Sequence, residues 1–217
     1  MPLDYGRRRV ILALAALPIG AAAASRVGSD DLMEEVDYRV LDPAQPVTAK
    51  ARVEVIEFFY YGCRWCNEFQ PYLDEWLLRK PADVAFRYQP AIRNTRWIVL
   101  TKAFYALQAL GQLPRLHVPL YRAYHREGIN VEDQAVLTGW ALKHGIDFKA
   151  FDALMRSDEI MSKVAASREL TYAYQVDSTP SVVVNGRYLT NSGIAGGVPR
   201  LMEVMEGLIA LARKEAR

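Results

Sequence analysis

The chain has 217 residues, of which 51% are hydrophobic and 24% charged, and its formal net charge is +2. This length suffices for one sizeable core, or for one core with an inserted subdomain. Residues 1–24 carry three arginines and one aspartate, so the remainder of the chain is formally neutral. A neutral chain lacks the basic footprint of a nucleic-acid-binding protein, which argues against that class.

The N-terminus has the three parts of an export signal. Arg7-Arg8-Arg9 form a basic region, residues 10–24 are apolar, and Ala22-Ala23-Ala24 resemble a cleavage site. The apolar run has 15 residues, fewer than the ~20 that span a bilayer comfortably. We therefore predict a signal peptide at 1–24, read by the general or the twin-arginine export route. An uncleaved membrane anchor is the alternative.

The first half of the remaining chain predicts a strand–helix–strand unit. Residues 30–50 are polar apart from Tyr38–Leu41 and predict a peripheral strand or arm. The run at 52–60 becomes continuously apolar, as a buried central strand does. A helix is expected at 63–80 and the next strand at 83–89.

The second half changes to a helical period and then returns to strands. Helices are expected at 96–110, 115–126, 131–144, 148–155 and 158–175. Asn185-Gly186 is a strong signal for a tight hairpin between strands at 181–184 and 187–189. The segment 199–213 is amphipathic and predicts a closing helix.

Cys63 and Cys66 are the only cysteines, and they directly follow the apolar strand. A Cys-x-x-Cys pair at a helix start is typical of a thioredoxin-type redox site. Unpaired backbone N–H groups and the helix dipole at such a start favour the thiolate of Cys63, the nucleophilic form.

Three alternatives to a redox pair stay open: a structural disulfide, a structural zinc site and two buried spectator thiols. The disulfide would close a very small loop and constrain the unfolded chain little. Zinc usually needs four ligands, and the three histidines that could complete the set do not fall in the His-x3–5-His spacing. We expect those histidines to lie at the surface or to be hydrogen-bonded in the fold: His117, His125 and His144.

The order of the elements favours an α/β protein with a thioredoxin-like fold and an inserted all-helical subdomain, because a strand–helix–strand unit forms a parallel pair with a right-handed crossover. A generic α/β domain with lid helices is the alternative. After the signal peptide, the expected division is a first part of the thioredoxin-like domain with its N-terminal arm at 25–95, the helical insertion at 96–168, and the second part of the domain at 169–217.

Thr179-Pro180 is the second informative feature, because it precedes a strand to which proline has no N–H to give. Together with Glu57-Phe58-Phe59, the Cys-x-x-Cys pair, the hairpin and the arm at 38–46, it resembles the DsbA family of bacterial periplasmic thiol:disulfide oxidoreductases. The resemblance covers roughly residues 34–211.

The resemblance implies a role for each of five residues. Cys63 matches the attacking, solvent-facing cysteine, and Cys66 matches its buried partner. Pro180 matches the cis-proline beside the disulfide, and Thr179 matches the residue whose backbone pairs with an extended substrate. Glu57 matches a buried acidic residue beneath the site; the alternative is a strand carboxylate paired with a lysine or a capping group.

The dipeptide between the cysteines departs from the family, in which Pro-His is most common. Trp65 can donate only its indole N–H, whereas Arg64 supplies a permanent positive charge. We predict that Arg64 and Trp65 tune the redox potential. The alternative is that both side chains point to solvent while the helix terminus stabilises the thiolate.

The resemblance thus predicts an exported enzyme that introduces disulfide bonds by exchange at Cys63 and Cys66, without a metal or another cofactor. It implies reduced or unfolded exported proteins as substrates, a quinone-linked membrane protein of the DsbB type for reoxidation, and a periplasmic location; a monomer is expected. The alternatives are a reductase or isomerase of the same superfamily, and a peptide-binding or chaperone-like module with a structural disulfide. An exposed apolar groove is expected for the substrate, and side chains that could line it are Tyr60, Tyr61, Trp65 and Ile194. For each of them an ordinary core or surface position is the favoured alternative.

Overall fold

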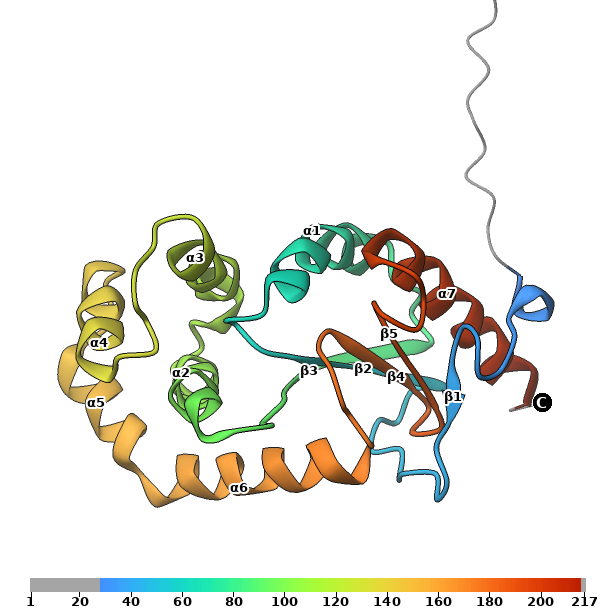
Figure 1. The fold of residues 1–217 in the computed structure, drawn as a ribbon. Helices are drawn as coiled ribbons and strands as arrows, with labels where there is room; N and C mark the ends of the chain where they lie inside the picture. The colour runs from blue at the N-terminus through green and yellow to red at the C-terminus, as the bar shows by residue number, and fades with distance from the viewer. Residues whose placement is uncertain (1–27, 216–217) are drawn as a thin grey trace, which may run out of the picture.

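The computed structural model describes residues 28–215, and the predicted signal peptide at 1–24 lies outside them. Five strands form one mixed sheet in the order β1-β5-β4-β2-β3. Helices α1 (Arg64–Arg79) and α7 (Val198–Glu215) cover one face of this sheet, and α6 (Asp158–Ala173) runs along the other face (Figure 1). The remaining helices gather at one end, beyond the start of α1 (Figure 1).

The middle of the sheet confirms the predicted strand–helix–strand unit. Strand β2 (Val53–Phe59) is buried along its whole length and pairs in parallel with β3 (Val84–Pro90). It pairs with β4 (Ser181–Val184) in the antiparallel sense. Because helices cover both faces, all seven residues of β2 are buried, and its side chains are apolar except for Glu54 and Glu57.

The β4–β5 hairpin confirms the Asn185-Gly186 turn and also anchors the N-terminal arm. Asn185 and Gly186 have φ of 50° and 62°, the left-handed pair that a two-residue hairpin turn requires. A Cβ on Gly186 would lie 2.1 Å from the carbonyl oxygen of Gln45, so only glycine fits there. The predicted peripheral strand is β1 (Arg39–Val40), which pairs antiparallel with β5 (Tyr188–Asn191).

Two apolar layers hold the sheet between its helices. On the α1 and α7 side, residues of β2 pack against residues of the two helices. This layer includes Val53 and Val55 of β2, Phe69 and Trp76 of α1, and Leu201 and Met205 of α7. On the other side, the core includes Ile56, Phe58, Val183, Leu189, Tyr174 and Val176. Burial of one such side chain contributes about 1.5–3 kcal/mol, so each layer is a major source of stability.

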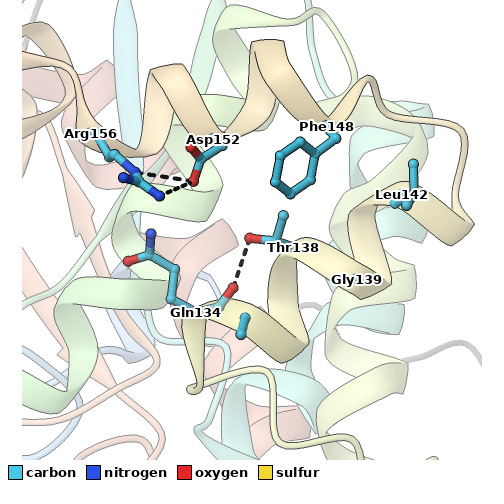
Figure 2. Close-up of a pocket in the computed structure, with 8 residues that line it drawn as sticks. Gln134, Thr138, Gly139, Leu142, Phe148, Asp152 and Arg156 are labelled. Carbon is cyan, nitrogen blue, oxygen red and sulfur yellow. Dashed lines mark hydrogen bonds and ion pairs between the residues drawn. The ribbon is translucent and has the colours of Figure 1, made fainter.

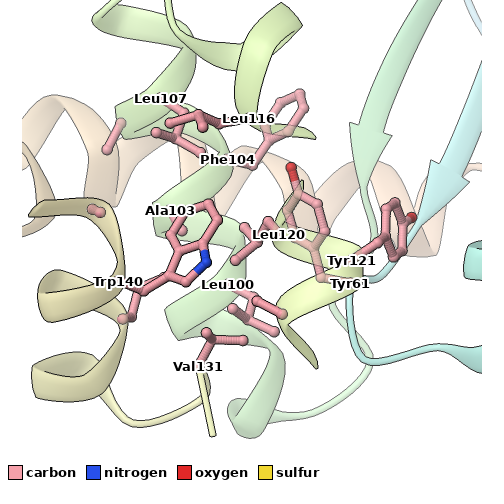
Figure 3. Packing of buried hydrophobic residues seen from close by; sticks show 14 of the residues in the cluster. Tyr61, Leu100, Ala103, Phe104, Leu107, Leu116, Leu120, Tyr121, Val131 and Trp140 are labelled. Atoms are coloured by element: carbon pink, nitrogen blue, oxygen red, sulfur yellow. The ribbon is translucent and has the colours of Figure 1, made fainter. Parts of the chain in front are cut away.

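The helical block has a core of its own. Its helices are α2 (Ile98–Ala109), α3 (Leu113–His125), α4 (Gln134–Lys143), α5 (Phe148–Arg156) and α6, which match the five predicted helices to within a few residues. Phe104, Leu120 and Trp140 pack together there, and Tyr61 from the end of β2 joins the same cluster (Figure 3). The helical block is therefore continuous with the turn that carries the cysteines. Helix α6 crosses residue 168, so the block and the rest of the domain share it.

The short 3-10 helix Ser29–Asp31 has no counterpart among the predicted elements, whereas a second one, Thr95–Trp97, overlaps the start of the helix predicted at 96–110. Among residues 28–215, none of the helices combines the length and the apolar character needed to cross a bilayer.

Candidate active site

Cys63 occupies the N-cap of α1. Strand β2 ends at Phe59, residues 60–62 turn, and the backbone N–H of Cys63 donates to the carbonyl of Tyr60 over 3.0 Å. The backbone N–H of Cys66 points at the Cys63 sulfur, 3.4 Å away. The sulfur thus stands where a serine or aspartate oxygen stands at an ordinary helix start, at the positive end of the helix dipole.

The two sulfurs lie in opposite environments and are not bonded to each other in this structure. A hydrogen bond from the Cys66 thiol, aided by the backbone N–H groups of Cys66 and Trp65, lowers the pKa of Cys63 to about 6 against the opposing effect of its partial burial. Burial raises the pKa of Cys66 well above its ordinary value. The pair therefore holds its negative charge on Cys63, which is also the sulfur with access to solvent.

The Thr179-Pro180 segment lies directly beside Cys63. Because β2 and β4 are antiparallel, the start of β4 lies next to the end of β2, with Phe58 opposite Ser181. The Cys63 thiol is 3.1 Å from the carbonyl oxygen of Thr179 and can donate to it. The Thr179–Pro180 peptide bond is cis, as the family resemblance implied.

Glu57 is a buried acid beneath the cysteine pair. It lies on β2 between Tyr88 on β3 and Val182 on β4, with no exposed surface. Neither carboxyl oxygen has a hydrogen-bond partner among residues 28–215, which contradicts the alternative of a lysine-paired or capping carboxylate. Burial raises the pKa of Glu57 well above its ordinary value, and the charge of Cys63 adds to the effect. Glu57 therefore keeps its proton at pH values at which an exposed glutamate has already lost it.

Arg64 and Trp65 point outward from the start of α1. The Arg64 guanidinium pairs with Glu68 one turn further on, 2.8 Å away, and lies 5.3 Å from the centre of the Trp65 ring. Trp65 is 51% exposed. What reaches Cys63 from this dipeptide is the backbone N–H of Trp65. The pKa of Cys63 is lowered first by the Cys66 thiol, then by the Thr179 side chain and by the backbone N–H groups of the helix start, while tuning by the Arg64 and Trp65 side chains stays a prediction.

Two of the four residues expected to line the groove do not do so. Tyr61 is 1% exposed, and its hydroxyl bonds to Nδ1 of His117 over 2.7 Å. The Tyr60 ring is also buried and stacks on Trp97. The groove assignment of Tyr60 and Tyr61 was therefore wrong, because the helical block covers the turn that they belong to. Trp65 and Ile194 keep exposed surface.

The three histidines are hydrogen-bonded in the fold, as predicted. Burial lowers the pKa of His117 to about 3, and its Nε2 lies 3.2 Å from Oε1 of Gln70. His125 and His144 each have a ring nitrogen within 2.9 Å of a backbone carbonyl. Across residues 28–215 no three His, Cys, Asp or Glu side chains gather into a group that could hold a metal ion.

Two polar residues near the site had no signal in the sequence. Gln70 is buried on α1, and its amide donates to Asp74 over 2.7 Å and to the Tyr88 hydroxyl over 2.9 Å. Glu132 bonds to the Tyr60 hydroxyl from the loop before α4. A charge pattern cannot show such residues, because their partners lie far away in the chain.

A separate cavity of about 480 Å³ lies between α4 and α5. Phe148 and Leu142 line it together with Gln134 and the Asp152–Arg156 ion pair (Figure 2). It shares no residue with the surroundings of the cysteines, so it is not part of this site.

A Cys-x-x-Cys helix start on a thioredoxin-like sheet, with its nucleophilic sulfur against a proline-containing loop, defines the class of protein thiol:disulfide oxidoreductases. The family model of the DSBA-like thioredoxin domain matches residues 54–203. The chain belongs to this DsbA-like family, as the resemblance predicted, and its α/β thioredoxin-like fold with a helical insertion is confirmed.

The chain is similar to known DsbA proteins in sequence and in structure over most of its length. It is 33% identical to the thiol:disulfide interchange protein DsbA of Azotobacter vinelandii over 176 residues, covering 81% of this chain and 82% of the relative. It is 31% identical to DsbA of Pseudomonas aeruginosa strain PAO1 over 207 residues, covering 95% and 96%. The crystal structure of Pseudomonas aeruginosa DsbA superposes with a TM-score of 0.82 at 30% identity, covering 87% of this chain and 98% of that one.

Proposed function

We propose that this enzyme introduces disulfide bonds into exported proteins, with Cys63 as the sulfur that substrates attack and Cys66 as its buried partner. The observation that carries the proposal is the division between the two sulfurs. Cys63 has solvent access and a pKa lowered to about 6, whereas burial keeps Cys66 a thiol.

The exchange proceeds in two steps. A substrate thiolate attacks the Cys63 sulfur of the Cys63–Cys66 disulfide, forming a mixed disulfide and releasing Cys66 as a thiolate, which takes up a proton. Glu57, which burial keeps neutral, is electrostatically coupled to Cys66, and we propose it as the source of that proton. A second substrate thiolate then attacks the mixed disulfide at the substrate sulfur, and Cys63 leaves as the stabilised thiolate. The substrate loses two electrons and the cysteine pair gains them.

The lowered pKa of Cys63 acts in the oxidising direction. At pH 7 only the part of the shift below 7 stabilises the dithiol, and from 7 to about 6 this is one unit. One unit corresponds to about 1.4 kcal/mol, or about 30 mV for a two-electron couple. Compared with a Cys63 thiol that stays protonated at pH 7, the thiolate therefore raises the reduction potential of the cysteine pair by about 30 mV.

The substrate side of the proposal rests on the Thr179-Pro180 segment. An extended substrate that pairs with the backbone of Thr179 would bring its sulfur beside Cys63, since the Thr179 carbonyl already lies 3.1 Å from that sulfur. The exposed Trp65 ring lies on the same helix start and is available for apolar contact. Reduced or unfolded exported proteins fit this arrangement.

The location and the recycling partner belong to the same proposal. The predicted signal peptide at 1–24 would direct export of the chain from the cytoplasm. The relatives that the chain matches are thiol:disulfide interchange proteins. We therefore propose a periplasmic monomer whose dithiol is reoxidised by a quinone-linked membrane protein of the DsbB type. The exchange itself requires only the cysteine pair and no other cofactor.

Two cysteine variants and a redox titration test the proposal. Cys63→Ser is expected to abolish oxidation of reduced, unfolded ribonuclease A, whereas Cys66→Ala is expected to trap a mixed disulfide with it. A chaperone-like module with a structural disulfide predicts that Cys63→Ser keeps its activity. In equilibrium with glutathione, an oxidase is expected above about −200 mV; a value near the thioredoxin potential of about −270 mV would favour the reductase alternative.

A further inference from the structure

Tyr60 touches both cysteines through its backbone. Its carbonyl accepts from the N–H of Cys63 over 3.0 Å. Its own N–H donates to the Cys66 sulfur, acting against the larger effect of burial on the Cys66 pKa. The Tyr60 ring lies on the turn itself, because a Cβ on Gly62 would come within 2.5 Å of it. A displacement of Tyr60 would therefore change the surroundings of both sulfurs.

Two contacts of the Tyr60 side chain come from the helical block. Its ring stacks on Trp97, which precedes α2, with ring centres 4.2 Å apart and planes within 1° of parallel. Its hydroxyl donates to the carboxylate of Glu132, in the loop between α3 and α4. The two contacts fix both the plane of the ring and the direction of its hydroxyl.

Glu132 is itself held in place. Its second carboxylate oxygen accepts from Arg96, 3.1 Å away, and Arg96 is the neighbour of Trp97 in the chain. The Glu132 side chain is only 18% exposed, whereas Arg96 is 77% exposed. A part-buried carboxylate with two donors is oriented more strongly than an exposed one, since hydrogen bonds to charged groups are stronger than those between neutral groups.

We propose that Glu132 is a positioning residue for the exchange reaction: it fixes the Tyr60 side chain, and through the Tyr60 backbone it holds the turn that places Cys63 at the helix start. This inference rests on the proposed role of Cys63 as the nucleophile. It makes the helical block a part of the redox site through one hydrogen bond.

Positioning and direct charge predict effects of opposite sign. If Glu132 acted on Cys63 only through its negative charge, removing it would lower the pKa of Cys63. If Glu132 holds the turn, removing it loosens the backbone N–H groups at the sulfur, and the pKa of Cys63 rises. The direction of the shift therefore separates the two mechanisms.

The experiment measures the rate of iodoacetamide alkylation of the reduced protein against pH for Glu132→Ala, Glu132→Gln and Tyr60→Phe. Glu132→Ala is expected to raise the midpoint pH of alkylation by about half a unit to one unit. At pH 7 it is expected to lower the equilibrium constant for reduction of the Cys63–Cys66 disulfide by glutathione about two- to fivefold. Glu132→Gln is expected to shift the midpoint less, because its amide oxygen still accepts from Tyr60. Tyr60→Phe plus Glu132→Ala is expected to shift it no more than either single variant.

The matched control is Glu127→Ala, which removes an exposed carboxylate from the same loop. It is expected to leave the midpoint unchanged. The inference is overturned if Glu132→Ala lowers the melting temperature while the midpoint stays at the wild-type value, if the midpoint falls, or if the shifts of the two single variants add. Failure of the proposed function would look different: wild-type Cys63 would then titrate as an ordinary thiol near pH 8.5.

Discussion

Replacing Glu57 by glutamine removes a buried ionisable group with little change of shape, and the pH dependence of stability reports its effect. Glu57 is fully buried, without a hydrogen-bond partner among the described residues. The groups that face it electrostatically are Cys63, Cys66, Asp74, Tyr61, Tyr88 and Tyr121. None of them supplies a positive charge that would favour its ionisation.

The expected magnitude follows from proton linkage. Above about pH 4.3 the unfolded chain has released the Glu57 proton, while the folded chain keeps it because burial raises the pKa. Folding then takes up a proton, and the free energy of unfolding falls by about 1.4 kcal/mol for each pH unit until the pH reaches the folded pKa. Glu57→Gln removes this dependence. The variant should therefore gain on the wild type by about 1.4 kcal/mol per pH unit across that window.

The assay is urea unfolding between about pH 4 and pH 8, in the disulfide form of both proteins. In the reduced form Cys63 would add the opposite slope between about pH 6 and pH 8.5, because its folded pKa is lowered. His117, whose pKa burial lowers to about 3, adds the opposite slope between about pH 3 and pH 6.5, but this contribution is common to wild type and variant and cancels in their difference. Glu75→Gln, on the exposed face of α1, is the control and should run parallel to the wild type. Parallel curves for Glu57→Gln and the wild type would refute the buried neutral acid.

Two further substitutions test the turn and the dipeptide. Gly186→Ala should cost about 2–4 kcal/mol in urea unfolding, because it combines a left-handed φ with a clash against Gln45. Gly111→Ala, with a φ of 67° and open space around it, should cost only about 1–2 kcal/mol, and equal losses would contradict the clash. Trp65→His should lower the pKa of Cys63 below about 6, because a protonated imidazole can donate to the thiolate. An iodoacetamide midpoint that stays or rises would count against tuning at this position.

The order of the elements and the position of Cys63 at a helix start were predictable because they rest on local patterns. The apolar run of β2, the cysteine pair at the next helix start and the Asn185-Gly186 turn each act over a few neighbouring residues. Their geometry follows from backbone sterics and helix-terminus electrostatics, which a short sequence already specifies.

The surroundings of the cysteines were not predictable in the same way. Tyr60 and Tyr61 were expected at a groove, yet Trp97, His117 and Glu132 enclose them. These partners come from the helical block, and a local sequence pattern cannot predict contacts between residues that lie so far apart in the chain.

The amino-acid order by itself determined which sulfur sits at the start of a helix and which strand leads to it, because propensities, caps and turns are set by near neighbours. Only the tertiary structure decided that Glu57 is a buried acid without a partner among residues 28–215, that the Thr179 carbonyl lies 3.1 Å from Cys63, and that Glu132 reaches Tyr60. Burial and long-range contacts depend on how the whole chain packs, and packing is what sets the ionisation of both cysteines.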